Sequence, residues 1–112
     1  VKEHFRGTDM IFIGSGYTCL QEFLPQAGQA AVRAGKTDMV GIGRMVIAYP
    51  ELPADALAGG PLRTKRICRT FGDCTTAPRG GMVSGCYPLD DFYKSRPECE
   101  CVKEIKRKFR EG

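Results

Sequence analysis

Two short apolar runs, each ended by a glycine turn and separated by a helical segment, set the architecture open to this chain. Asp9–Ile13 ends in Gly14-Ser15-Gly16, and Asp38–Ile42 ends in Gly43-Arg44. Short apolar runs bounded by turns are typical of buried strands in parallel sheets. The order strand, glycine turn, helix, strand, glycine turn therefore predicts a βαβ unit with two neighbouring parallel strands.

The segment between the runs, Leu20–Ala34, has the spacing of a helix. Its apolar residues on one face are Leu20, Phe23, Leu24, Ala27, Ala31 and Ala34. Because proline lacks an N–H, Pro25 is expected to kink this helix or restart it. Gly35 is suited to end it.

The rest of the chain has weaker patterns. Prolines limit regular structure before Ala54–Ala58, which has room for one or two helical turns. Leu62–Tyr93 is rich in Cys, Gly, Thr and Pro and is expected to be mostly ordered loop, helical at its start over Leu62–Phe71. Residues 1–60, 61–94 and 95–112 thus form three parts.

The last part has the clearest helical signal. Ser95-Arg96-Pro97-Glu98 has capping-box spacing. Val102, Ile105 and Phe109 then form one apolar stripe, and basic residues near the C-terminus favour the helix dipole. We expect an amphipathic C-terminal helix.

The two glycine turns are the candidate functional site. Parallel barrels bind ligands at the C-terminal ends of their strands, and glycine lets exposed backbone N–H groups approach a phosphate. Arg44 can add a charge-assisted hydrogen bond to phosphate oxygens. These residues, Gly14, Ser15, Gly16, Gly43 and Arg44, predict one anion cradle. From spacing alone, glycines that serve only tight turns explain the pattern equally well.

Three stretches together resemble a known family. Ile11–Thr18, Asp38–Arg44 and Tyr49–Leu52 are similar to the end of the Old Yellow Enzyme and NADH:flavin oxidoreductase family. The resemblance covers Thr8 to about Leu57. A whole (β/α)₈ barrel needs about 250 residues, whereas this chain has 112. The resemblance therefore implies an α/β fold, the C-terminal portion of a TIM barrel with its last two strands and helices.

The resemblance also implies a function. In that family both glycine turns hold the phosphate of FMN. The resemblance therefore implies that the phosphate-binding residues are Ser15, Gly16, Gly43 and Arg44, with Gly14 shaping the turn. It implies NAD(P)H as reductant, a small-molecule electron acceptor, and the remainder of the barrel as a structural partner. Catalytic residues are expected upstream of Val1, because none of the family's catalytic positions matches a residue here. The family's acid at the start of the last strand corresponds to Asp38, for which we expect a structural role.

Cysteines mark the middle part. It resembles a degenerate copy of the iron–sulfur linker of the dienoyl-CoA reductase branch, C-x₂-C-x₃-C-x₁₁-C. Cys74 and Cys86 keep the x₁₁ spacing, but the two earlier ligand positions fall on Ile67 and Thr70. Because a cluster needs four well-placed thiolates, no [4Fe–4S] cluster is expected.

Zinc also fits the cysteines poorly, because Cys68-x₅-Cys74 is longer than usual ligand spacings and Cys99-x-Cys101 projects two thiols to different faces of a helix. The simplest interpretation is that the cysteines are free, reduced thiols, buried or partly buried, rather than metal ligands. The roles of Cys68, Cys74 and Cys86 stay open. Two rival hypotheses therefore remain: a phosphate-binding barrel enzyme without flavin, and a non-enzymatic, cysteine-based metal module.

Composition and charge argue against a membrane-spanning, a secreted or a nucleic-acid-binding protein. No run approaches the roughly 18 apolar residues of a membrane span, and no basic stretch leads into an apolar core as in a signal peptide. The net charge is +4, with much of the excess in Lys103–Arg110, but without the aromatic residues that stack on nucleic-acid bases. We therefore expect a cytoplasmic protein that binds neither membranes nor nucleic acid, and a fragment that begins within a longer chain.

Overall fold

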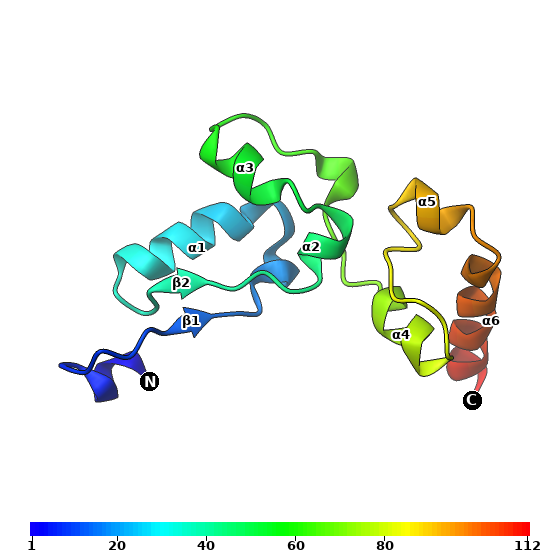
Figure 1. Ribbon diagram of the computed structural model, residues 1–112, viewed down its shortest axis with the longest axis horizontal. Coiled ribbons are helices and arrows are strands. Elements are labelled where there is room, and N and C mark those ends of the chain that lie inside the picture. Colours follow the sequence, from blue (N-terminus) through cyan, green and yellow to red (C-terminus); the bar gives the residue numbers. More distant parts are fainter.

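The computed structural model describes residues 1–112 and contains the βαβ unit (Figure 1). Strands β1 (Ile13–Gly14) and β2 (Met39–Val40) pair in parallel, with Ile13 opposite Met39 and Gly14 opposite Val40. Helix α1 (Leu24–Arg33) connects them. The predicted parallel pair is thus confirmed, although each strand has two residues rather than five.

The connection between the strands has two parts. A 3₁₀ segment, η2 (Tyr17–Phe23), follows the first glycine turn and contains a non-helical residue, Gln21. Pro25 lies in the first turn of α1 and so restarts the helix rather than kinking it. Gly35, at φ +68°, follows the helix end, as predicted. Of the predicted apolar face, Leu24 is buried, whereas Phe23 is 66% exposed.

Close packing holds α1 against the sheet. A Cβ added to Gly28 would lie 3.0 Å from Cγ2 of Val40, so the helix backbone lies directly on β2. Because successive strand residues point to opposite faces, the face of β2 that carries Met39 is turned away from α1. That face is open: its large apolar residues are each more than half exposed, namely Ile11, Ile13 and Met39.

Short helices follow β2: α2 (Met45–Ala48), α3 (Leu52–Leu57) and a 3₁₀ turn, η3 (Thr64–Arg66). Helix α3 begins two residues earlier than expected because Pro53 fits its first turn. The predicted helix over Leu62–Phe71 is wrong, since only η3 forms there. Ile67 and Cys68, two successive residues, are both buried, and the backbone at Ile67 is extended.

Helices α4 (Asp73–Arg79), α5 (Asp91–Lys94) and α6 (Glu98–Glu111) form the C-terminal part. The expectation of a mostly irregular loop over Leu62–Tyr93 missed α4 and the start of α5. Pro78 lies inside α4 and cannot donate to the Cys74 carbonyl. The hydroxyl of Ser84 donates to that carbonyl instead, at 2.7 Å.

Helix α6 forms as predicted but begins differently. The capping box is absent, because the Ser95 hydroxyl donates to the Phe92 carbonyl and Glu98 pairs with Arg96 at 2.7 Å. Along the predicted stripe Val102 is buried, but Phe109 is 82% exposed. No helix combines the length and apolar character that crossing a bilayer requires.

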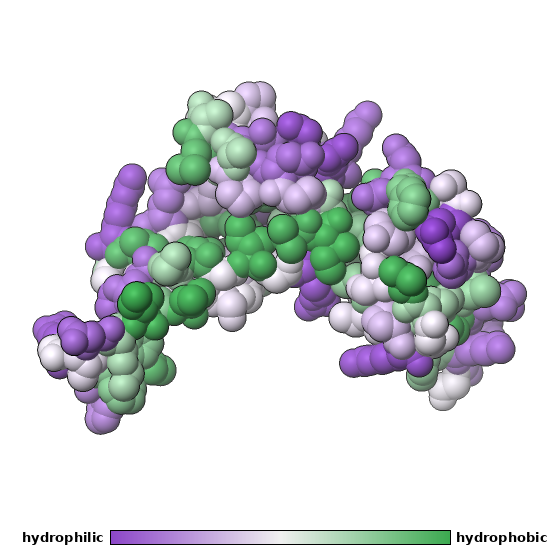
Figure 2. Space-filling model, in the orientation of Figure 1, coloured by the Kyte–Doolittle hydropathy of each residue, from purple (hydrophilic) through white to green (hydrophobic).

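The molecule is elongated, with extents of 51 × 33 × 22 Å. Its radius of gyration is 17.0 Å, whereas a compact domain of this length has about 13 Å. The buried apolar side chains form two separate groups rather than one core. The first joins α1, α2 and α3 to the cysteine segment: Leu24, Met45, Ala48, Tyr49, Leu52, Ile67, Cys68 and Cys86. The second lies among the C-terminal helices: Ala77, Tyr87, Cys99 and Val102. Apolar side chains also gather on the visible surface over the βαβ part (Figure 2).

Candidate functional site

The strand pairing places the two glycine turns next to each other (Figure 1). Just past the ladder, the N–H of Gly41 donates to the carbonyl of Gly14 at 2.7 Å. A Cβ added to Gly41 would lie 3.7 Å from Cβ of Ser15. The C-terminal ends of β1 and β2 therefore meet at one edge, as the sequence predicted for parallel neighbours.

Backbone donors at these turns have no protein partner. The N–H groups of Ser15, Gly16, Gly43 and Arg44 donate no hydrogen bond within the chain. A Cβ added to Gly16 or Gly43 would meet no atom within 4 Å, so open space lies beside both residues. Unpaired donors beside open space are what a bound anion requires.

Gly14 and Gly16 of the first turn are each required to be glycine, but for different reasons. At Gly16 the φ angle of +92° is one that side chains disfavour. At Gly14 the constraint is packing, because an added Cβ would lie 3.0 Å from Oη of Tyr17 and 3.1 Å from Oγ1 of Thr37. Gly14 therefore shapes the turn, and the open donors belong to the residues after it.

Arg44 is exposed and carries an unpaired charge. Arg63, Arg66 and Arg96 all pair with carboxylates, whereas Arg44 forms no hydrogen bond or ion pair through its side chain. The side chain lines a small cavity beside the cysteine segment. Arg44 thus belongs both to the second glycine turn and to the lining of that cavity.

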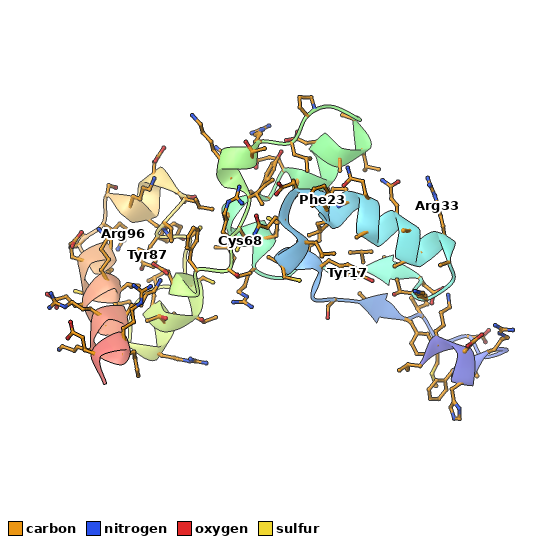
Figure 3. The ribbon with its side chains drawn as sticks, turned by 180° about the vertical axis from the view of Figure 1, so that it is seen from behind. Tyr17, Phe23, Arg33, Cys68, Tyr87 and Arg96 are labelled. Atoms are coloured by element: carbon orange, nitrogen blue, oxygen red, sulfur yellow. The ribbon has the colours of Figure 1, made fainter.

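Three cysteines share this cavity with Arg44, a neighbourhood that the sequence did not predict. Cys68, Cys74 and Cys86 all line it, and its volume is about 10 Å³, room for roughly one water molecule. Figure 3 shows Cys68 between the βαβ part, marked by Tyr17, and the C-terminal helices, marked by Tyr87. All six cysteines are free thiols. No three His, Cys, Asp or Glu side chains are arranged to hold a metal ion.

Burial controls the chemistry of two of these thiols. It raises the pKa of Cys74, with Cys68 adding to the rise and the Arg44 charge opposing it. Burial likewise raises the pKa of Cys86. A raised pKa favours the neutral thiol, and only the thiolate is a good nucleophile. We therefore expect both thiols to react slowly near neutral pH.

Alkylation rates should follow this difference. In the native protein, iodoacetamide at pH 7.5 should modify the exposed Cys19 and Cys101 well before Cys74 and Cys86, as read by peptide mass spectrometry. Raising the pH further should speed modification of the last two, because a growing fraction of their thiols ionises. A denatured sample, in which all six react, is the control. Equal rates for Cys86 and Cys101 at neutral pH would contradict the burial argument.

Asp38 has the structural role expected of it. Its carboxylate accepts a hydrogen bond from the N–H of Phe12 at 2.9 Å and pairs with Lys2. The hydrogen bond from Lys2, followed by that from Phe12, lowers the pKa of Asp38. The side chain ties the entry of β2 to the entry of β1, at the edge opposite the glycine turns.

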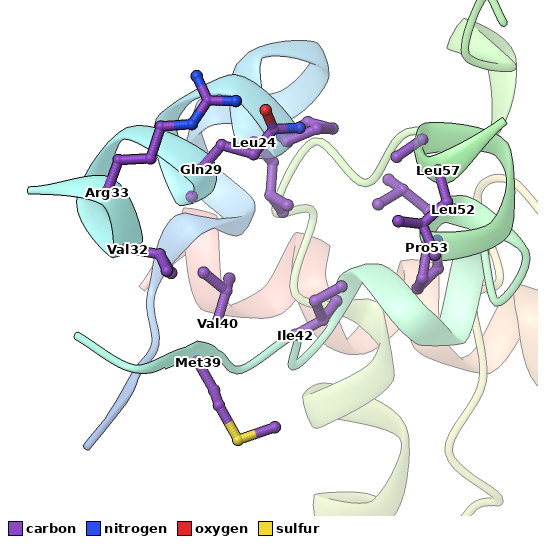
Figure 4. Close-up of a pocket in the computed structure, with 13 residues that line it drawn as sticks. Leu24, Gln29, Val32, Arg33, Met39, Val40, Ile42, Leu52, Pro53 and Leu57 are labelled. Atoms are coloured by element: carbon purple, nitrogen blue, oxygen red, sulfur yellow. The ribbon is translucent and has the colours of Figure 1, made fainter. Parts of the chain in front are cut away.

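An apolar groove of about 630 Å³ lies between α1, β2 and α3 (Figure 4). Val32, Val40 and Ile42 lie along it, with Arg33 at one end and Leu52 at the other. It includes none of the glycine-turn residues. Sequence periodicity did not indicate this groove, since it depends on the separation of α1 and α3.

Comparisons of the chain with protein-family models, curated proteins and solved structures find no match. Only the geometry of the glycine turns and the residues that carry the family resemblance therefore bear on function.

Proposed function

We propose that this chain supplies the FMN phosphate-binding end of an FMN-dependent NAD(P)H oxidoreductase of the Old Yellow Enzyme type. One observation carries the proposal: Ser15, Gly16, Gly43 and Arg44 present unpaired N–H donors at adjacent ends of two parallel strands. Barrel enzymes frequently bind phosphate at this place, after their last two strands.

The residues fit a phosphate group chemically. Backbone donors from both turns would bind its oxygens, and the unpaired guanidinium of Arg44 would supply the opposite charge. The bound flavin would supply hydride transfer from NAD(P)H to a small-molecule acceptor such as an activated alkene. In this proposal the chain binds and orients the cofactor, and no residue of it is assigned a catalytic role.

The remainder of a barrel is the structural partner that the proposal requires. Parallel sheets are normally covered on both faces, yet Ile13 and Met39 are 63% and 54% exposed. Both outer edges of the two-stranded sheet also lack a neighbouring strand. Earlier strands of a barrel would supply those neighbours and cover that face.

Flavin content of the full-length protein tests the proposal. We expect about one FMN per chain, released on denaturation and distinguished from FAD and riboflavin by chromatography. The apoprotein should bind FMN more tightly than riboflavin, which lacks the phosphate. A protein that binds sugar phosphates but no flavin would instead support the rival barrel enzyme.

The metal-module hypothesis has one observation in its favour, the three thiols around one cavity. We nevertheless predict no stoichiometric iron or acid-labile sulfide after anaerobic purification, because Ile67 and Thr70 occupy two of the four ligand positions. Metal analysis by mass spectrometry and a sulfide assay measure both. Four iron atoms per chain would show that Cys68, Cys74 and Cys86 form a cluster with another thiol.

A further inference from the structure

One short segment of the cysteine region touches the elements that follow both glycine turns. The N–H of Cys68 donates to Sδ of Met45 at 3.2 Å, and Met45 directly follows Arg44. Next along the chain, the guanidinium of Arg69 donates to Oε1 of Gln21, which lies in η2 after the first turn. Cys68 and Arg69 thus connect η2, which follows the first glycine turn, with Met45, which follows the second.

The hydrogen bond between Arg69 and Gln21 lies beside two residues of unusual backbone conformation, Gln21 itself and Thr70. Gln21 and Thr70 are the only non-glycine residues with positive φ, at 53° and 57°. Such backbone persists only where the surroundings hold it in place. Arg69 precedes Thr70 and bonds to Gln21, so its hydrogen bond joins the two positions. The N–H of Thr70 also donates to Sγ of Cys68, at 3.3 Å.

The partner of Arg69 is neutral. Three residues earlier, Arg66 pairs instead with the carboxylate of Glu51 at 3.2 Å. Gln21 fixes the Arg69 guanidinium without neutralising it. Arg69 therefore ties η2 to the cysteine segment through a neutral partner.

We propose that Arg69, acting through Gln21, is a positioning residue that holds the two glycine turns at the separation a phosphate monoester needs. The inference rests on the proposed function. At the strand ends the turns are joined by the bond from Gly41 to Gly14. The contacts of Cys68 and Arg69 join the elements beyond them, so the site is fixed on both sides.

Ligand discrimination in the full-length apoprotein tests this role. FMN and riboflavin are titrated by flavin fluorescence, and their affinities are compared. Arg69→Ala should lower FMN affinity about 3- to 10-fold, as expected for one exposed hydrogen bond, and leave riboflavin affinity unchanged. The matched control, Arg66→Ala, removes another exposed arginine of the same segment and should change neither.

Variants of the partner residue separate positioning from a general loss of stability. Gln21→Ala should lower FMN affinity as much as Arg69→Ala, and the double variant should lose no more, because the two side chains act as one pair. Gln21→Glu keeps the acceptor oxygen and should retain the preference for FMN over riboflavin.

Each remaining outcome is decisive. An unchanged FMN-to-riboflavin ratio in Arg69→Ala, or an equal loss of both ligands, overturns the positioning role while the proposed function stands. If the wild-type protein binds inorganic phosphate but no flavin, the flavin proposal fails, and Arg69→Ala must still weaken phosphate binding. If it binds neither, both proposals fail.

Discussion

The 112-residue chain expressed alone should aggregate or unfold without a cooperative transition. Only 16 of its 112 residues are buried, and the 12 apolar side chains among them form two separate groups. Domains of this length usually enclose one contiguous core. Circular dichroism during urea titration and size-exclusion chromatography measure the outcome, with the full-length protein as the control.

The exposed apolar surface gives the physical reason. The sheet has two residues in each strand, and one of its faces leaves Ile11, Ile13 and Met39 in water. The groove between α1 and α3 adds a second uncovered apolar surface. Exposed surface of this kind promotes association, whereas the rest of a barrel would bury it.

The isolated chain should also lack activity. With added FMN and NADPH it should not reduce enones, because catalytic groups in barrel enzymes come from several strand ends and this chain offers two. A monomeric, cooperatively folded and active chain would contradict the fragment hypothesis. Ile13–Gly14 and Met39–Val40 would then belong to a different, complete small fold.

The βαβ unit could be predicted because its signals are local. Glycine ends both apolar runs, and Pro25 and Gly35 bound the helix between them. Parallel pairing then follows from the connection alone. The same logic placed the donors of Ser15, Gly16 and Gly43 at one edge, where the structure has them.

The cysteine region could not be predicted because its order depends on long-range contacts. Helix α4 contains two threonines and Pro78, a composition that disfavours helix. It is held by Lys106 of α6, which pairs with the buried Asp73 and donates to the carbonyl of Phe71 at 3.1 Å. Nothing local indicates that α6 would reach this far back, nor that Arg44 and Cys68 would line one cavity.

Replacing Arg44 should have the largest effect of any single substitution at the proposed site. In the full-length protein that the proposal requires, Arg44→Ala should weaken FMN binding about 10- to 150-fold, because losing one charged hydrogen-bonding partner costs roughly 1.5–3 kcal/mol. Riboflavin affinity should change little, since that ligand has no phosphate. Flavin titration of the apoprotein measures both affinities.

Two further variants distinguish charge from geometry. Arg44→Lys keeps the charge but loses the planar fork of donors, so its FMN affinity should fall between those of the wild type and Arg44→Ala. Arg33→Ala removes an exposed arginine on the rim of the apolar groove and should leave FMN affinity unchanged. If Arg44→Ala binds FMN as tightly as the wild type, its guanidinium is not part of the phosphate site. The unpaired charge beside Cys68 and Cys74 would then need another explanation, and the backbone donors of Ser15, Gly16 and Gly43 would have to hold the anion alone.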